Sequence, residues 1–86
     1  MLEKIGKCFK IINGHGTSNL LNFYTYRTKP FGKIFVIPVG QIVTIVDISS
    51  HYEPIFLFNN RFYIGCSGIS KNFNEYLEEV VVDKTA

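Results

Sequence analysis

Alanine and tryptophan are nearly or wholly missing from this chain of 86 residues, and cysteine occurs only twice. The single alanine is Ala86, and because alanine is the best helix former, its scarcity argues against a helix-rich fold. Cys8 and Cys66 are too few and too far apart to form the disulfide framework of a small secreted domain. We therefore expect a mainly β domain with two reduced, buried thiols.

Long apolar runs are also lacking. None approaches the roughly 18 residues of a membrane span, and residues 1–12 are too short and too lysine-rich for a secretory signal. We therefore expect no membrane partner and a cytoplasmic location. A hydrophobic content of 47% and a charged content of 19% are typical of one small compact domain covering residues 1–86. The abundance of Ile, Asn, Lys and Phe is typical of an AT-rich genome, such as that of a low-GC bacterium, its phage or another mobile element.

Residues 55–64 predict a β-hairpin. The pair Asn59-Asn60 is a two-residue turn of the type that tolerates positive φ. This turn sets four opposed pairs: Phe58 with Arg61, Leu57 with Phe62, Phe56 with Tyr63 and Ile55 with Ile64. Alternation then forms one face from Ile55, Leu57, Phe62 and Ile64, and another from Phe56, Phe58, Arg61 and Tyr63. We expect the first face to be core, and whether the second is exposed or covered by the C-terminal segment stays open.

Further extended segments are expected at residues 4–12, 20–27, 33–37 and 41–48. In the first, Ile5, Phe9 and Ile11 share one side. Residues 38–40 predict a tight turn that sends residues 41–48 back antiparallel to the preceding strand. Short strands at this spacing indicate a small barrel or roll over residues 1–69.

One helix is expected at the C-terminal end, over residues 70–82. Ser70 is a suitable N-cap, and an apolar stripe at helical spacing follows it. The stripe consists of Ile69, Phe73, Tyr76, Leu77, Val80 and Val81. The run Val80-Val81-Val82 lowers helix propensity, so packing has to hold the last turn.

A family resemblance runs from residue 20 to residue 69. It is carried by Leu21-Asn22-Phe23, Pro30, Val39-Gly40, Ile42, Ile45, residues 55–58, Arg61, Tyr63, Ile64 and Ile69. In this order the chain resembles the bacterial SH3-like domain. The resemblance implies a small barrel of five to six antiparallel strands and binding of cell-wall or proline-rich peptides. It also implies a groove of flat aromatic walls lined by Tyr24, Tyr26, Tyr52 and Phe31.

Charge is unevenly distributed along the chain. Residues 1–46 carry a net charge of +5 and residues 47–86 a net charge of −3. A molecule with separated charges can steer an oppositely charged partner, although a solvated exterior explains the same pattern. Arg27, Lys29 and Lys33 could contact phosphates in the basic loop 27–33. The rings of Tyr24, Tyr26 and Phe31 would then stack on bases.

Catalytic and metal-binding patterns are weak. Cys66 lies in Gly65-Cys66-Ser67-Gly68, where His15 or His51 could act as its base. Cys8, Cys66, His15 and His51 form a two-Cys two-His set, but no pair has the close spacing of a zinc site. Structural cysteines and surface histidines explain these residues, so we expect no enzyme activity, no metal and no cofactor.

The sequence therefore predicts a non-catalytic small binding module or inhibitor that acts through protein–protein contact. The alternative is a nucleic-acid-binding small barrel that uses the loop 27–33. The weak net charge and the acidic C-terminal segment favour a protein partner. The candidate partner-binding residues are Tyr24, Tyr26, Phe31, Tyr52, Arg27, Lys29 and Lys33. Oligomeric state and partner identity stay open.

Overall fold

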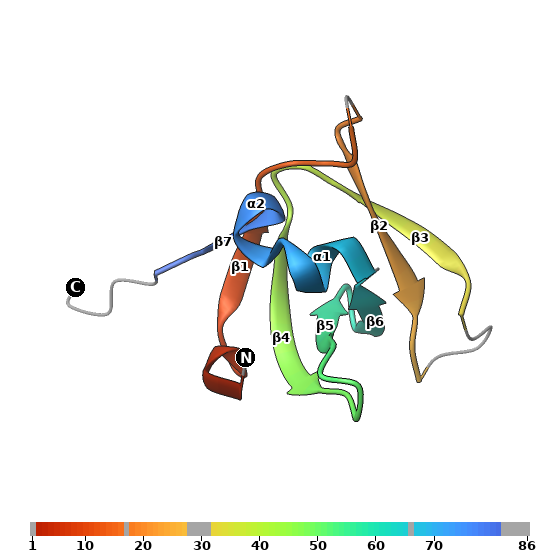
Figure 1. The fold of residues 1–86 in the computed structure, drawn as a ribbon, viewed down its shortest axis with the longest axis vertical. Coiled ribbons are helices and arrows are strands. Elements are labelled where there is room, and N and C mark those ends of the chain that lie inside the picture. The colour runs from red at the N-terminus through yellow and green to blue at the C-terminus, as the bar shows by residue number, and fades with distance from the viewer. Residues whose placement is uncertain (1, 17, 28–31, 66, 82–86) are drawn as a thin grey trace.

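A computed structural model describes residues 2–16, 18–27, 32–65 and 67–81. The strands are β1 (Cys8–Ile11), β2 (Leu20–Thr25), β3 (Ile34–Pro38), β4 (Ile42–Ile48), β5 (Pro54–Phe58), β6 (Arg61–Gly65) and β7 (Leu77–Glu79). The helical segments are the 3₁₀ helix η1 (Leu2–Lys4) and the α-helices α1 (Ser67–Lys71) and α2 (Phe73–Tyr76). The expected mainly β class is thus confirmed, and both α-helices are short (Figure 1).

All seven strands belong to one antiparallel sheet, in the order β3-β2-β6-β5-β4-β1-β7. The two edge strands, β3 and β7, do not pair with each other, so the sheet is open. The expected closed barrel of five to six strands is therefore wrong in both strand number and closure.

The connection from β3 to β4 also differs from expectation. The two strands are not neighbours, because residues 38–41 carry the chain from the sheet edge to its middle. Gly40 has a φ of +99°, and its N–H donates to the Ile11 carbonyl at 2.8 Å. The Val39 N–H donates to the Asn19 carbonyl, also at 2.8 Å. The expected tight turn therefore forms, but it crosses the ends of β1 and β2 and does not close a hairpin.

The hairpin of β5 and β6 has the register that the sequence predicts, with all four pairs confirmed. Asn59 and Asn60 both have positive φ, as a two-residue turn of this kind requires. The expected core face is confirmed at Ile55, which is fully buried, but it is otherwise wrong. Phe56 and Tyr63 are almost completely buried, whereas Leu57 and Phe62 are only half-buried. Phe56 packs against the Phe23 ring of β2 and Tyr63 stacks on the Phe35 ring of β3, and these contacts place the two side chains in the core.

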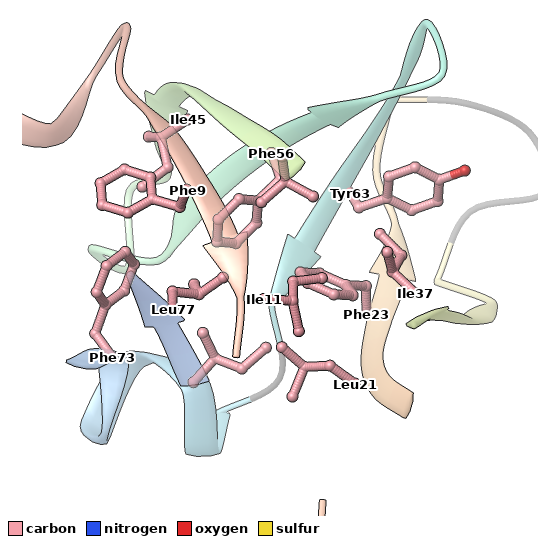
Figure 2. Close-up of a cluster of buried hydrophobic side chains, with 12 residues drawn as sticks. Phe9, Ile11, Leu21, Phe23, Ile37, Ile45, Phe56, Tyr63, Phe73 and Leu77 are labelled. Atoms are coloured by element: carbon pink, nitrogen blue, oxygen red, sulfur yellow. The ribbon is translucent and has the colours of Figure 1, made fainter. Parts of the chain in front are cut away.

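The core lies on the face of the sheet that the C-terminal segment covers. Ile69 of α1, Phe73 of α2 and Leu77 of β7 join the buried cluster (Figure 2). The Phe73 ring meets the Phe9 ring edge-to-face at 5.1 Å between centroids. Phe56 and Tyr63, the buried part of the hairpin's aromatic face, belong to the same cluster as this segment.

The C-terminal segment is not the single helix expected over residues 70–82. Asn72 interrupts it with a φ of −127° and a ψ of 46°, and Leu77 is already extended. From Leu77 the chain becomes β7 and pairs with β1. Of the six residues of the expected stripe, Ile69, Phe73 and Leu77 are buried, Tyr76 and Val80 are half-buried, and Val81 is 79% exposed. Val80, the first residue of the valine run, donates its N–H to the Cys8 carbonyl at 2.9 Å, so this β-branched residue lies beside β1 and not in a helical turn.

The N-terminal segment is shorter as a strand than expected. Residues 2–4 form η1, and β1 begins only at Cys8. Phe9 and Ile11 are buried as expected, but Ile5 is 41% exposed. The Gly6 N–H donates to the Ile45 carbonyl at 2.7 Å, so the chain contacts β4 before the regular ladder starts.

Candidate interaction surface

The face of the sheet turned away from the core, here called the outer face, carries a row of side chains across five strands. Cross-strand partners project to the same side, so the register defines the row. Its members, from the β3 edge inward, are Ile34, Tyr24, Ile64, Ile55 and Asp47. Four apolar residues thus lead from the sheet edge to one carboxylate.

Exposed apolar side chains gather at the β3 end of this row. Among the described residues, half of the exposed large hydrophobic side chains lie on β2 and β3. They are Leu20, Tyr24, Ile34, Phe35 and Val36, and we call them the β2–β3 patch. Ile34 is 65% exposed, and Phe35 stacks on Tyr63 at 4.9 Å between ring centroids. The patch therefore wraps around both sides of an edge strand.

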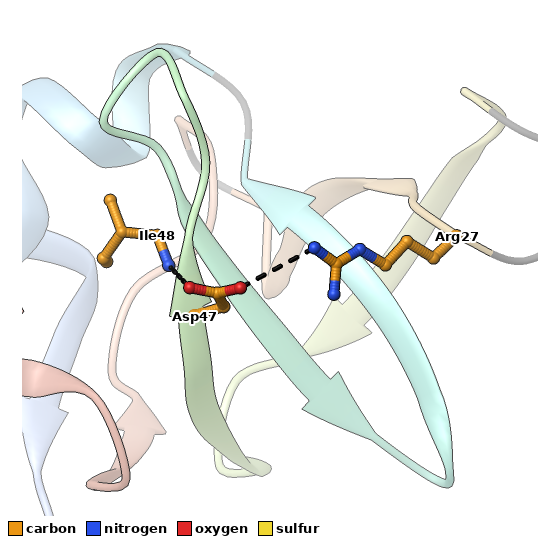
Figure 3. Close-up of polar contacts among 3 residues, drawn as sticks. All are labelled: Arg27, Asp47 and Ile48. Atoms are coloured by element: carbon orange, nitrogen blue, oxygen red, sulfur yellow. Dashed lines mark hydrogen bonds and ion pairs between the residues drawn. The ribbon is translucent and has the colours of Figure 1, made fainter.

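Arg27 forms an ion pair with Asp47 at the other end of the row. Its guanidinium lies 3.6 Å from Asp47 Oδ2 and 5.2 Å from the centre of the Tyr26 ring. The Ile48 N–H donates to Asp47 Oδ1 at 2.8 Å, which orients the carboxylate (Figure 3). Arg27 follows β2 and Asp47 belongs to β4, and β6 and β5 lie between these two strands. The ion pair therefore crosses two strands on the outer face, where Ile55 of β5 is fully buried. Arg27 is therefore already engaged by an acid and a ring.

The tyrosines expected to line one groove lie in different settings. Tyr24 belongs to the patch, and Tyr26 is half-buried with its N–H donating to the Phe62 carbonyl at 2.9 Å. Tyr52 lies in the loop between β4 and β5, is 81% exposed and has a φ of 60°. Within the described parts of the chain, no ring contact joins Tyr52 to Tyr24 or Tyr26.

The basic loop is described only at its two ends. Lys33 is exposed, and its backbone N–H donates to Thr25 Oγ1 at 3.0 Å. Lys29 and Phe31, both expected at the site, lie outside the described residues. Arg27 and Lys33 thus flank the exposed β2–β3 ribbon as its described cations.

A shallow depression that the sequence did not reveal lies at the opposite end of the outer face. It measures about 580 Å³ and is open to solvent on one side. Its lining is Gly40, Gln41, Ile42, Leu57, Phe58, Asn59 and Asn60. The sequence predicts the Asn59-Asn60 turn on one side of the depression. It does not predict that residues 38–41 cross the sheet and form the other side.

The residues considered for catalysis are dispersed. His15 lies against the Tyr76 ring at 5.4 Å, His51 is exposed in the β4–β5 loop, and Cys66 lies outside the described residues. Cys8 Sγ lies 3.4 Å from Thr44 Oγ1. In the described ranges, no group of three or more His, Cys, Asp or Glu side chains is placed to hold a metal ion.

Comparison with known proteins finds no family model, curated protein or solved structure that matches this chain. Within the described residues, every helix is too short to cross a membrane.

Proposed function

We propose that the protein is a non-catalytic binding module, or small inhibitor, that acts through protein–protein contact at the β2–β3 patch. The observation that carries this proposal is the concentration of exposed apolar side chains on one terminal hairpin of the sheet. Isolated exposed apolar residues are ordinary, whereas contiguous ones beside polar groups mark interaction sites.

The composition of the patch supports a protein partner. Tyr24 and Phe35 are rigid aromatic side chains, a type that contributes strongly to binding energy when a partner buries it. Ile34 and Val36 provide β-branched surface with little rotamer entropy to lose. Arg27 and Lys33 supply charge at the rim. The resemblance to SH3-like domains suggests the same kind of partner, an extended peptide that lies against aromatic side chains including Tyr24.

Nucleic-acid binding is the weaker proposal. A phosphate would have to compete with Asp47 for Arg27, whose guanidinium also lies over the Tyr26 ring. The net charge of the whole chain is only +2. Affinity for nucleic acid comes largely from phosphate contacts, so a chain of such low net charge has little to offer.

The test is affinity capture from an extract of the host cell, with two matched variants. Ile34→Ser removes an exposed isoleucine from the patch, and Ile42→Ser removes an exposed isoleucine from β4 on the same outer face. We expect the first variant to lose most of the captured protein and the second to retain it. Nuclease treatment of the extract should not change the result.

Two outcomes would contradict the proposal. Equal capture by the wild-type protein and Ile34→Ser would mean that the patch is not the binding surface. Capture that disappears with nuclease would favour nucleic acid as the direct ligand. Both variants are first checked for unchanged thermal unfolding, because an exposed side chain should contribute little to stability.

A further inference from the structure

Among the described residues, no strand pairs with the outer edge of β3, so the backbone groups on that edge are not used within the sheet. On the β2 side, the Thr25 N–H donates to the Lys33 carbonyl at 2.9 Å, and the Val39 N–H donates to the Asn19 carbonyl at 2.8 Å. In an antiparallel pair every second residue faces the neighbouring strand, so Phe35 and Ile37 also bond to β2. The N–H and C=O groups of Ile34 and Val36 therefore point away from the sheet.

The two edges of the sheet differ in how they are protected. Edge strands are commonly shielded by short length or by charge. The β7 edge has both, since it is three residues long and carries Glu78 and Glu79. Glu79 also forms an ion pair with Lys7 at 3.4 Å. The β3 edge is five residues long, contains no charged residue and has only Pro38 at its end as a barrier.

The β3 edge is complementary to itself. An antiparallel pairing centred on Phe35 places Ile34 opposite Val36 of a second copy, and each such pair exchanges two N–H···O=C bonds. Pro38, which has no N–H, is not needed as a donor in this register. Lys33 then lies opposite an isoleucine, Ile37 of the second copy, so no like charges meet.

The aromatic side chains agree with the same register. The two Phe35 residues would be directly opposed, in the closer type of antiparallel pair. Each Phe35 already stacks on Tyr63 of its own chain. Pairing would therefore bring the Phe35–Tyr63 stack of one copy beside the same stack of the other. On the outer face, it would place Ile34 of each copy against Val36 of the other.

We propose that two copies of the chain associate through β3, antiparallel about a twofold axis centred on Phe35. This inference rests on the proposed function only in assigning the same hairpin to contact with protein. Two strands of this length bury less than the roughly 1,200 Å² of a standard stable interface. The dimer is accordingly weak, with a dissociation constant of micromolar order or above.

The first experiment is analytical ultracentrifugation from low micromolar to near-millimolar concentration. Val36→Pro deletes the outward N–H while keeping an apolar side chain, and proline is tolerated at an edge position whose N–H faces solvent. Val36→Thr is the matched control, because it keeps both the N–H and the branched shape. We expect dimer formation in the wild-type protein and Val36→Thr, and only monomer in Val36→Pro.

A second variant tests the same pairing in case the proline variant does not fold. Val36→Lys keeps the backbone donor but places two cations close to the twofold axis, which should also abolish the dimer. A monomeric wild-type protein at every concentration would overturn the proposal. So would a dimer that persists in both variants, or species that grow beyond a dimer, as pairing of β3 with β7 of another copy would produce.

Amide hydrogen exchange tests the register directly. With rising concentration, exchange should slow at the Ile34 and Val36 amides, while the Phe35 amide, already bonded within the sheet, should be unaffected. Protection that appears only when a captured protein is added would assign the edge to that protein and overturn the pairing. Loss of capture in Ile34→Ser with normal amide protection would refute the proposed function alone, so the two failures are distinguishable.

Discussion

Replacing Phe56 with alanine tests which face of the β5–β6 hairpin holds the core. Phe56 is fully buried and meets the Phe23 ring edge-to-face, with 5.3 Å between centroids and an interplanar angle of 84°. Truncating a buried phenylalanine costs about 3–5 kcal/mol from lost apolar transfer and the remaining cavity. A domain of this size is typically stable by only about 4–13 kcal/mol, so the loss is a large share of the total.

Urea denaturation followed by fluorescence or circular dichroism measures the effect. The matched variant is Leu57→Ala, one residue along the same strand, where the side chain is half-buried on the outer face. We expect its loss to be clearly smaller than that of Phe56→Ala. If Phe56→Ala is too unstable to fold, Phe56→Leu gives the comparison with a smaller loss. A larger loss for Leu57→Ala than for Phe56→Ala would refute the face assignment.

Three further predictions concern local structure, each measured by the free energy of unfolding. Asn60→Val should lower it by about 1–2 kcal/mol because a β-branched residue is strained at positive φ, whereas Asn60→Gly should not lower it. Gly14→Ala should cost about 1–3 kcal/mol, since the new Cβ would overlap the Ser18 carbonyl oxygen and the backbone N and O of Leu20, the last two each at 2.7 Å. An unchanged free energy of unfolding would contradict this packing. Asp47→Asn should cost less than about 1 kcal/mol, as expected for a half-exposed ion pair with Arg27, and high salt should shrink the difference; a loss that ignores salt would argue against the ion pair.

Local geometry was the part of the fold that the sequence specified best. The Asn59-Asn60 turn determines the whole register of β5 and β6, because a two-residue loop leaves no freedom in strand pairing. Which face points inward was not specified, since both faces of this hairpin are apolar. That choice depends on what packs against the sheet, and the rings that meet Phe56 and Tyr63 belong to other strands, Phe23 to β2 and Phe35 to β3.

The C-terminal segment shows a second limit. Spacing of three or four residues predicts a buried helical stripe, and Ile69, Phe73 and Leu77 are buried. The change of backbone at Leu77 comes from pairing with β1, more than 60 residues earlier in the chain, which no local pattern reports. Tertiary pairing here overrides the local preference.

The candidate site was predicted only in part. Tyr24 was singled out for its aromatic ring, and the structure places it in the exposed patch. The exposure of Ile34, Phe35 and Val36 was not predicted, because the sequence indicates an extended segment at residues 33–37 but not that this strand lies at the edge of the sheet. The order of strands in a sheet depends on long-range pairing, which the spacing of residues does not encode.

The most direct test of the central claim is a binding titration between the protein and its captured partner, at low and at high salt. Tyr24→Ala should remove on the order of 1–4 kcal/mol of binding free energy, as a buried aromatic contact does. Tyr52→Ala, which removes an exposed tyrosine outside the patch, serves as the control and should leave affinity nearly unchanged. Affinity of the wild-type protein should vary little with salt. Equal losses for the two tyrosines, or tight single-stranded oligonucleotide binding that weakens steeply with salt, would contradict the account.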